Sequence, residues 1–174
     1  MQIYKILSAL LEYPDQELFD NLPVISKLLD ETVDTDVAEW AEVKKFVTWL
    51  ENGDPIEIQE DYVRTFDLTP EHSLHLTHHF FGDDNDKNRG PALIDLGELY
   101  KDYGVKQMTN ELPDYLPLIL EFVALQEDKE AKAFLSDASK VLMVLADNLK
   151  KANSPYAPLV SIVKNRAAPV CIAA

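Results

Sequence analysis

The sequence predicts an all-α protein in which residues 1–174 form a single domain, a bundle of about eight helices. Three observations support this. Apolar residues recur at three- and four-residue spacing through most of the chain, prolines and glycines stand at the ends of these stretches, and no stretch alternates with a period of two for long enough to form a strand. With 174 residues, of which 47% are hydrophobic, the chain is long enough to bury one substantial core.

The first predicted helix covers residues 3–12 and ends before Pro14, because proline disfavours the helical conformation of the residue that precedes it. Asp15 is expected to cap the next helix, and Pro23 to begin a new turn that leads towards an acidic linker over 30–36. A strong apolar face then predicts a helix over 36–51.

Pro55 is expected at the first position of the following helix, where its missing N–H has no cost. Thr69 is expected to cap a further helix over 70–81, which the polar run after it must end. Pro91 begins a helix that ends at Gly104, because glycine readily takes the left-handed conformation found after a helix.

The last third of the chain begins with a proline-rich corner over 111–117, which predicts a tight turn followed by a helix with Pro117 in its first turn. The longest predicted helix covers 130–151, and the last covers 155–166.

The formal charge of −15 is unevenly distributed. Residues 1–104 contain 23 of the 31 acidic residues and only 8 of the 16 basic ones, whereas the remainder of the chain contains 8 of each. Because phosphate contacts require clustered Lys and Arg, this excess of acidic residues argues against nucleic-acid binding. It also argues against binding to an anionic membrane. Two interpretations of the acidity remain: the chain binds a basic partner, or the charge serves solubility alone.

No apolar run reaches the roughly 20 residues that span a bilayer, and the amino terminus has no basic region or cleavage site typical of a signal peptide. We therefore expect a cytoplasmic protein without membrane insertion. Cys171 is the single cysteine, so no internal disulfide is expected.

All four histidines lie within eight residues, at positions 72, 75, 78 and 79. On a continuous helix, His72, His75 and His79 would share one face and could bind a metal ion, with Glu71 as a carboxylate ligand. The zinc-enzyme pattern, however, has a Glu beside its first His, and here Leu76 takes that place. A half-exposed histidine face is therefore the main interpretation, and a metal-dependent helical enzyme is the alternative.

A peptide groove is the second candidate site. Its predicted apolar floor consists of Tyr62, Phe66, Leu74 and Phe81, and its rim consists of the acidic loop after Phe81 together with Asp114 and Tyr115 on the proline corner. Arg89 is expected to hold two of Asp83, Asp84 and Asp86 through paired hydrogen bonds. Such a groove suits a short helix with one apolar face and Lys or Arg on the other. The proline corner alone is also consistent with an ordinary helix–helix turn.

Several motifs, in this order and spacing, resemble one known family. They are LLEYP, YVRTFD, SLHLTHHFFGD, NRGPALIDL, LYKDYG and ELPDYLPLILEF. Together they are similar to the assembly chaperones of respiratory nitrate reductase, the NarJ type, and the resemblance covers residues 1–165. It implies an all-helical cytoplasmic chaperone, not an enzyme, without a cofactor of its own. The implied partner is the amino-terminal segment of the molybdenum catalytic subunit, which is kept competent until its cofactor is inserted.

The family's loop motif maps onto Gly82, Asp83, Arg89 and Gly90, and its corner motif onto Glu111, Pro113, Asp114 and Leu116. The combined prediction for client-peptide contacts is Tyr62, Phe66, Leu74, His78, Phe81, Asp83, Asp86, Arg89, Asp114, Tyr115 and Leu118. Tyr115 stands where relatives often have histidine, so a related molybdenum reductase is an alternative client. Many relatives continue with a charged tail, and the oligomeric state, monomer or dimer, stays open.

Overall fold

The computed structural model describes residues 2–31, 37–81, 86–106 and 110–167. In these ranges the chain forms ten α-helices and no strand, which confirms the predicted all-α class. None of the helices in these ranges is long and apolar enough to cross a membrane.

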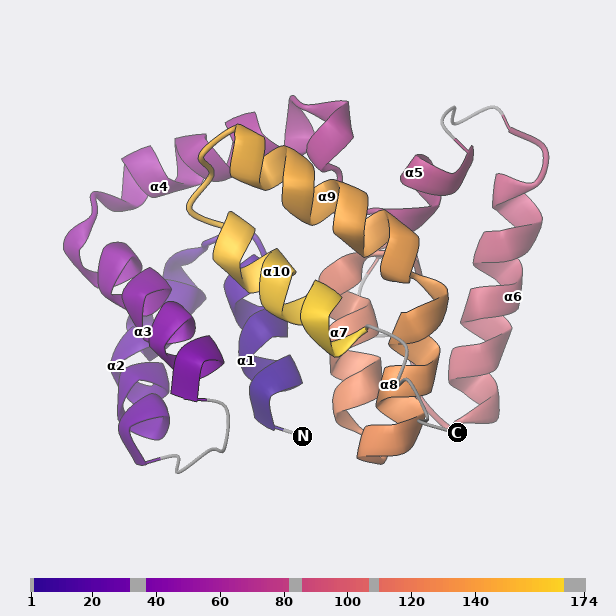
Figure 1. The fold of residues 1–174 in the computed structure, drawn as a ribbon, viewed down its shortest axis with the longest axis horizontal. Helices are drawn as coiled ribbons and strands as arrows, with labels where there is room; N and C mark the ends of the chain where they lie inside the picture. Colours follow the sequence, from indigo (N-terminus) through magenta and orange to yellow (C-terminus); the bar gives the residue numbers. More distant parts are fainter. Residues whose placement is uncertain (1, 32–36, 82–85, 107–109, 168–174) are drawn as a thin grey trace, which may run out of the picture.

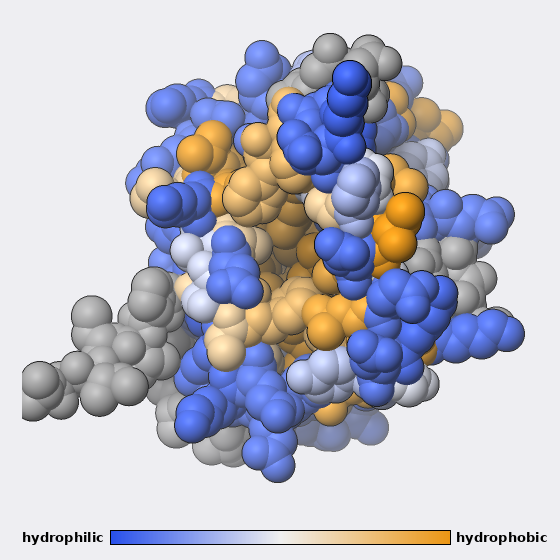
Figure 2. All heavy atoms as spheres, turned by 90° about the vertical axis from the view of Figure 1, so that its right-hand side faces the viewer, coloured by the Kyte–Doolittle hydropathy of each residue, from blue (hydrophilic) through white to orange (hydrophobic). Residues whose placement is uncertain are grey.

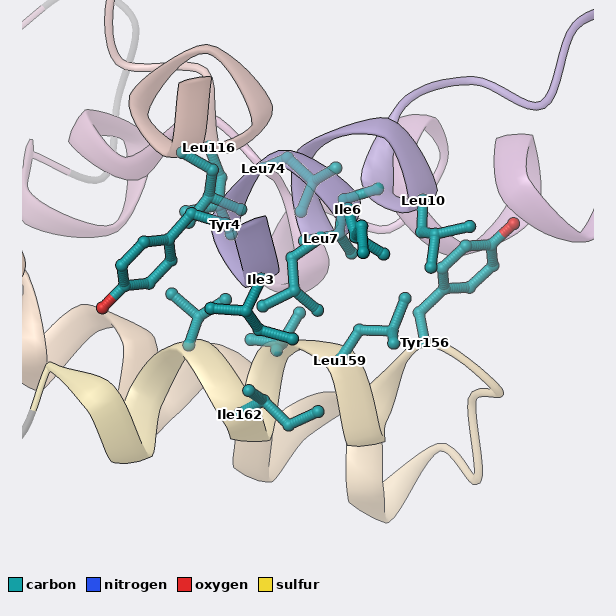
Figure 3. Packing of buried hydrophobic residues seen from close by; sticks show 14 of the residues in the cluster. Ile3, Tyr4, Ile6, Leu7, Leu10, Leu74, Leu116, Tyr156, Leu159 and Ile162 are labelled. Atoms are coloured by element: carbon teal, nitrogen blue, oxygen red, sulfur yellow. The ribbon is translucent and has the colours of Figure 1, made fainter. Parts of the chain in front are cut away.

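Helix α1 (Gln2–Leu11) is the central element of the fold. It packs most extensively against α7 (Leu116–Ala124), and its inward residues also meet α10 (Ala157–Arg166). Figure 3 shows Ile3, Leu7 and Leu10 of α1 beside Leu159 and Ile162 of α10. Because α1 buries side chains towards several neighbours at once, its position sets the position of the elements around it.

Helices α2 (Gln16–Glu31) and α3 (Val37–Asn52) pack side by side at one edge of the molecule (Figure 1). Asp15 caps α2 as predicted, since its Oδ1 accepts a hydrogen bond from the amide of Leu18 at 2.9 Å. The predicted new turn at Pro23 is wrong, because α2 continues through it. Leu22 and Leu29 stay on one buried face while Pro23 faces solvent, so burial against α3 outweighs the hydrogen bond that proline removes.

Arg166 connects the end of α10 to α3. Its Nε and Nη2 both lie 2.6 Å from Oε2 of Glu39, and its guanidinium stands 5.8 Å from the ring centroid of Tyr4 on α1. Both partners of the ion pair are largely buried, so this contact ties three helices together.

Helix α4 (Pro55–Tyr62) begins as predicted with Pro55 at its first position, and the side chain of Asp54 caps it. It continues into a π-helical turn, Val63–Asp67, in which the amide of Leu68 donates to the carbonyl of Val63 at 3.0 Å. Such turns are rare and are frequent at functional sites.

The predicted continuous helix over 70–81 is wrong. A short 3-10 turn, Pro70–His72, is followed by an extended break and then by α5 (Leu76–Phe81). Thr69 has the extended conformation of a capping residue, but its hydroxyl donates to the carbonyl of Arg64 at 2.9 Å instead of capping the turn. The cause of the break is a contact with the proline corner, described below.

Helix α6 (Arg89–Asp102) stands at the opposite edge of the molecule from α2 and α3 (Figure 1). Its apolar residues Leu93 and Leu96 are only half-buried, whereas Tyr100 is fully buried. Gly104 ends it with φ +72°, as predicted. The side of the molecule near α6 is hollowed, with hydrophobic side chains inside and hydrophilic ones around the edge (Figure 2).

The predicted long helix over 130–151 is in fact two helices, α8 (Asp128–Asp137) and α9 (Ser139–Lys151), with a bend at Ala138. Both helices have the same apolar period, so the pattern alone does not show the bend. Before the bend, α8 packs against α7, and after it, α9 packs along α10, so each helix buries its own face. The last helix, α10, ends at Arg166 as predicted.

Candidate functional site

The break before α5 is held by the proline corner through a short antiparallel bridge. The amide of Leu116 donates to the carbonyl of Leu74 at 2.8 Å, and the amide of Leu76 donates to the carbonyl of Asp114 at 3.1 Å. These bonds satisfy backbone groups that a continuous helix would have paired within itself, which explains why the helix is interrupted there.

The carboxylate of Asp114 lies beneath this bridge and is only 1% exposed. Its Oδ2 accepts hydrogen bonds from the amide of Thr77 at 3.0 Å and from the Thr77 hydroxyl at 2.5 Å, and its Oδ1 lies 3.3 Å from Nδ1 of His75. The Nε of Arg89 donates to the Thr77 hydroxyl at 3.0 Å. We call these four residues, Asp114, Thr77, His75 and Arg89, the Asp114 clamp.

Two opposing effects set the pKa of Asp114. Burial raises it, but the hydrogen bonds from His75 and Thr77 favour the ionised form more strongly, and the pKa therefore lies below its usual range. A carboxylate that is ionised, buried and already hydrogen-bonded is not accessible to a ligand. The predicted place of Asp114 on an exposed acidic rim is therefore wrong, because its side chain points inward and connects the proline corner to α5.

The clamp also positions an aromatic ring. The ring of His75 lies against that of Tyr115, with centroids 5.2 Å apart and planes inclined by 33°. The hydroxyl of Tyr115 in turn lies 3.1 Å from that of Tyr62, which is itself 3.1 Å from the carbonyl of Leu11 on α1. Burial raises the pKa of Tyr115 to about 12, so the phenol stays protonated and can take part in this hydrogen-bond chain.

Tyr115 and Tyr62 line a cleft of about 270 Å³ that we call the aromatic cleft. Its other lining residues are Tyr13, Phe66, Asp67, Ser73, Leu74, His75 and Glu111. The rings of Tyr13 and Tyr62 meet edge to face with their centroids 5.5 Å apart, and the ring centroid of Phe66 lies 4.8 Å from that of Tyr62. The π-helical turn brings both Phe66 and Asp67 to this cleft, which therefore combines an aromatic wall with carboxylates.

The structure brings together four of the predicted contact residues, Tyr62, Phe66, Leu74 and Tyr115, in the aromatic cleft. Tyr62, Phe66 and Leu74 are almost completely buried, so they support the cleft from below more than they present area to a ligand. Leu118 lines a different groove, beside α1. His78 and Phe81 lie half-buried on α5 and do not line the cleft.

The predicted contact of Arg89 with three aspartates falls partly outside the described residues, since Asp83 and Asp84 lie in the range 82–85. Within the described part, the amide of Arg89 donates to the carbonyl of Asp86 at 3.1 Å, and the Asp86 carboxylate accepts from the amide of Asn88. The Nε of Arg89 instead donates to the Thr77 hydroxyl, a contact that the sequence pattern did not suggest.

The alternative of a metal site on one histidine face is not supported. The break separates His72 from His75, and the ring nitrogens meet different groups: His72 Nδ1 lies 3.2 Å from the carbonyl of Thr65, and His79 Nε2 lies 2.8 Å from that of Ser73. Across the described ranges, no three His, Cys, Asp or Glu side chains are grouped so that they could hold a metal ion.

The predicted peptide contacts did not include six residues of this region, namely Tyr13, Asp67, Ser73, His75, Thr77 and Glu111. Thr77 belongs to the clamp and the other five line the aromatic cleft; of the six, His75 had been named as a metal-ligand candidate and Glu111 as part of the corner motif. All six lie within the motifs quoted for the family resemblance: Tyr13 in LLEYP, Asp67 in YVRTFD, Glu111 in ELPDYLPLILEF, and the other three in SLHLTHHFFGD. These motifs held the available signal, but they did not show which of their residues meet in space.

Comparisons with known proteins show which sequences the chain is similar to. The sequence model described as "Nitrate reductase delta subunit" matches residues 30–161 of the chain. The chain is 32% identical over 158 residues to the nitrate reductase molybdenum cofactor assembly chaperone NarJ of Escherichia coli K12; the match covers 91% of this chain and 66% of that protein. The chain thus spans about two thirds of that relative's length.

Two further relatives show similar identity. The probable nitrate reductase molybdenum cofactor assembly chaperone NarJ of Bacillus subtilis is 32% identical over 160 residues, covering 92% of this chain and 85% of that protein. The nitrate reductase-like protein NarX of Mycobacterium tuberculosis is 30% identical over 161 residues, covering 92% of this chain but only 24% of the longer relative.

Proposed function

The chain belongs to the nitrate reductase delta subunit family, and on this premise we propose that it is an assembly chaperone for a respiratory nitrate reductase. Its relatives in Escherichia coli and Bacillus subtilis carry the name of molybdenum cofactor assembly chaperone. In this proposal the chain acts in the cytoplasm, catalyses no reaction, and holds the amino-terminal segment of the molybdenum-containing catalytic subunit until the cofactor has been inserted. A chaperone for a related molybdenum reductase is the alternative within the same class.

The aromatic cleft is the observation that carries the proposal. Tyr13 and Tyr115 offer partly exposed aromatic surface, while Tyr62 and Phe66 fix these rings from below. Asp67 and Glu111 supply negative charge at the same cleft. An apolar side chain that enters between the rings, next to a Lys or Arg in the same segment, would satisfy both features.

The Asp114 clamp gives the cleft a fixed shape. Because His75 is held by Asp114 and lies against Tyr115, the ring of Tyr115 is pre-positioned before a peptide arrives. A pre-positioned anchor loses less conformational entropy on binding than a mobile one. The role of Asp114 in this proposal is therefore to position Tyr115, and not to contact the client.

The test is titration calorimetry with a synthetic peptide that corresponds to the amino terminus of the catalytic subunit. We expect one peptide per chain, and we expect Tyr115→Ala to weaken binding by about 1–3 kcal/mol, as for a partly buried aromatic anchor. Tyr115→Phe keeps the ring and should bind nearly as the wild type does. Phe80→Ala removes an exposed aromatic ring outside the cleft and is the matched control.

Salt supplies a second readout. Raising the ionic strength from 0.01 M to 0.15 M shortens the screening length from about 30 Å to about 8 Å, so association should slow while dissociation changes little. A wild-type chain that fails to bind the peptide, or that binds a scrambled peptide equally well, would refute the proposal.

A further inference from the structure

A polar hollow of about 640 Å³ lies where the end of α3, the start of α4 and the turn after α9 meet. Trp49 lines it from α3, Glu57, Glu60 and Asp61 line it from α4, and Asn153 and Pro155 line it from the turn after α9. It shares none of its described lining residues with the aromatic cleft, so both surfaces can be occupied at the same time. We call this surface the acidic hollow.

Close backbone packing gives the acidic hollow its shape. A Cβ at Gly53 would lie 2.8 Å from Cδ1 of Ile58 and 3.1 Å from the carbonyl oxygen of Trp49, so a larger residue would push α3 and α4 apart or displace the Ile58 side chain. Asn153 has φ +53°, the left-handed conformation common after a helix, and it turns the chain towards Pro155. The hollow is therefore part of the framework of the fold.

Negative charge dominates this hollow. Four of its described lining residues are acidic and one, Arg64, is basic. Asp54 is used to cap α4, and Asp61 pairs with Arg64. Among the described residues, Glu57 and Glu60 form no ion pair, and both are exposed. Two carboxylates one turn apart on α4 are thus available to a cation that enters the hollow.

The arrangement suits an organic cation better than a metal ion. A bound Ca²⁺ or Mg²⁺ requires several oxygen ligands that converge within about 2.0–2.6 Å of one point. Within the described ranges, no three His, Cys, Asp or Glu side chains are grouped in that way. A guanidinium group, by contrast, presents five N–H donors spread over a plane and can reach two carboxylates at once.

Trp49 adds an aromatic surface to the same hollow. Its ring is half-buried and is held in place by Phe46, with ring centroids 5.3 Å apart, and by Tyr156, with centroids 5.9 Å apart and planes inclined by 82°. The face of a tryptophan ring attracts cations, and arginine is the side chain most often found there. The hollow therefore combines a fixed aromatic ring with unpaired carboxylates.

Behind this wall lies a hydroxyl group without a partner. Tyr156 is 1% exposed, and its hydroxyl has no hydrogen-bond partner among the described residues. Figure 3 shows the hydroxyl pointing away from α10. Burial and the nearby Asp61 carboxylate raise the pKa of Tyr156, so the hydroxyl stays protonated beside a residue that lines the hollow. Because an unpaired buried hydroxyl costs free energy, a hydrogen-bond donor that enters at Asp61 would be favoured.

We infer that the acidic hollow binds an arginine side chain of a protein partner, with the guanidinium plane against the Trp49 ring and its N–H groups towards Glu57 and Glu60. The partner is a protein that presents an exposed arginine, and it is distinct from the client's amino-terminal segment. This interaction goes beyond the proposed function, because it lies outside the aromatic cleft and gives the chain a second binding surface.

The experiment is a nuclear magnetic resonance titration of the isotope-labelled chain at low ionic strength. The probe is a capped five-residue peptide with one central arginine among glycines, and we expect a dissociation constant on the order of 1 mM. The indole N–H signal of Trp49 and the amide signals of Glu57 and Asn153 should shift together. The indole signal of Trp40, which is buried elsewhere on α3, should stay in place.

Two further ligands separate the contributions to binding. A peptide with citrulline in place of arginine keeps the shape but loses the charge, and it should bind at least about tenfold more weakly. Free L-arginine carries a backbone carboxylate that the acidic hollow repels, so it should bind at least about threefold more weakly than the capped peptide. Equal binding of citrulline would refute the inference, and equal binding of free arginine would assign the hollow to the amino acid instead of a protein.

Variants of the chain locate the site. Glu57→Gln/Glu60→Gln removes the two unpaired carboxylates and should weaken binding at least about fivefold. Glu127→Gln/Glu130→Gln is the matched control, because it removes two exposed carboxylates with the same spacing at the start of α8 and should stay within about twofold. If both double variants behave alike, the probe responds only to net charge and the inference fails.

Trp49→Leu removes the aromatic surface and should weaken binding about twofold to fivefold. Because this ring also packs on Phe46, the melting temperature of the variant is measured first; the double glutamate variant changes only exposed side chains and keeps the test valid if Trp49→Leu is unstable. A saturating amount of the client peptide should leave the affinity for the arginine probe within about twofold. Displacement of the probe by the client peptide would show that the hollow belongs to the client site and would refute a separate partner.

Discussion

Thr77→Val tests whether Asp114 is a structural clamp. The substitution keeps the shape of the side chain and replaces the hydroxyl, which donates to Asp114 at 2.5 Å and accepts from Arg89 Nε at 3.0 Å, by a methyl group. A hydrogen bond to a charged group contributes about 1.5–3 kcal/mol, so we expect the free energy of unfolding to fall by about 2 kcal/mol. For a chain of this length, that corresponds to a melting temperature lower by about 4–8 °C.

The measurement is urea unfolding followed by circular dichroism, with Thr48→Val as the matched control. Thr48 is exposed on α3, and the same change there should stay within about 0.5 kcal/mol. The double variant Thr77→Val/Asp114→Asn completes a thermodynamic cycle, and we expect a coupling energy above about 1 kcal/mol. If Thr77→Val behaves as the control does, or if the two changes are additive, Asp114 is not held by Thr77.

Three further predictions concern the protonation of Asp114, the ion pair of Arg166 and the end of α6. Ionised Asp114 should stabilise the folded state at pH values above the usual carboxyl pKa. Because the pKa of Asp114 is lowered in the folded state, this stabilisation is lost as the pH falls. In an acid titration, Asp114→Asn should therefore lose less stability than the wild type between about pH 5 and pH 2. Arg166→Ala removes the largely buried partner of Glu39 and should lower the free energy of unfolding in urea by about 3 kcal/mol. Arg166→Lys should recover part of the lost stability. A loss below about 1 kcal/mol for Arg166→Ala would show that the ion pair does not stabilise the fold. Gly104→Ala should lower the free energy of unfolding by about 1 kcal/mol through the φ of +72° alone, since no other group lies within 4 Å of the added methyl. An unchanged melting temperature would contradict this expectation.

The aromatic cleft is small, and two of its tyrosines are held by hydrogen bonds. The Tyr62 hydroxyl donates to the carbonyl of Leu11 on α1 and lies 3.1 Å from the Tyr115 hydroxyl, while the ring of Tyr115 lies against that of His75 in the clamp. A cleft fixed in this way suits recognition of one anchoring residue.

The sequence alone determined the features that depend on neighbouring residues. The all-α class, the start of α4 at Pro55, the cap at Asp15 and the end of α6 at Gly104 all follow from local periodicity and capping chemistry, and the structure confirms each. The grouping of Tyr62, Phe66 and Tyr115 also followed in outline, because apolar periodicity had placed the first two on one inward face.

Only the tertiary structure decided the features that depend on residues distant in the chain. The helix predicted over 70–81 is interrupted because backbone groups around Leu74 bond to the corner some 40 residues later, and no local pattern records that partner. Aspartate is usually found at the protein surface, yet Asp114 is buried, because Thr77 and His75 supply hydrogen bonds that replace those to water. The bend at Ala138 has the same origin, since α8 and α9 share one apolar period and differ only in the helices against which they pack.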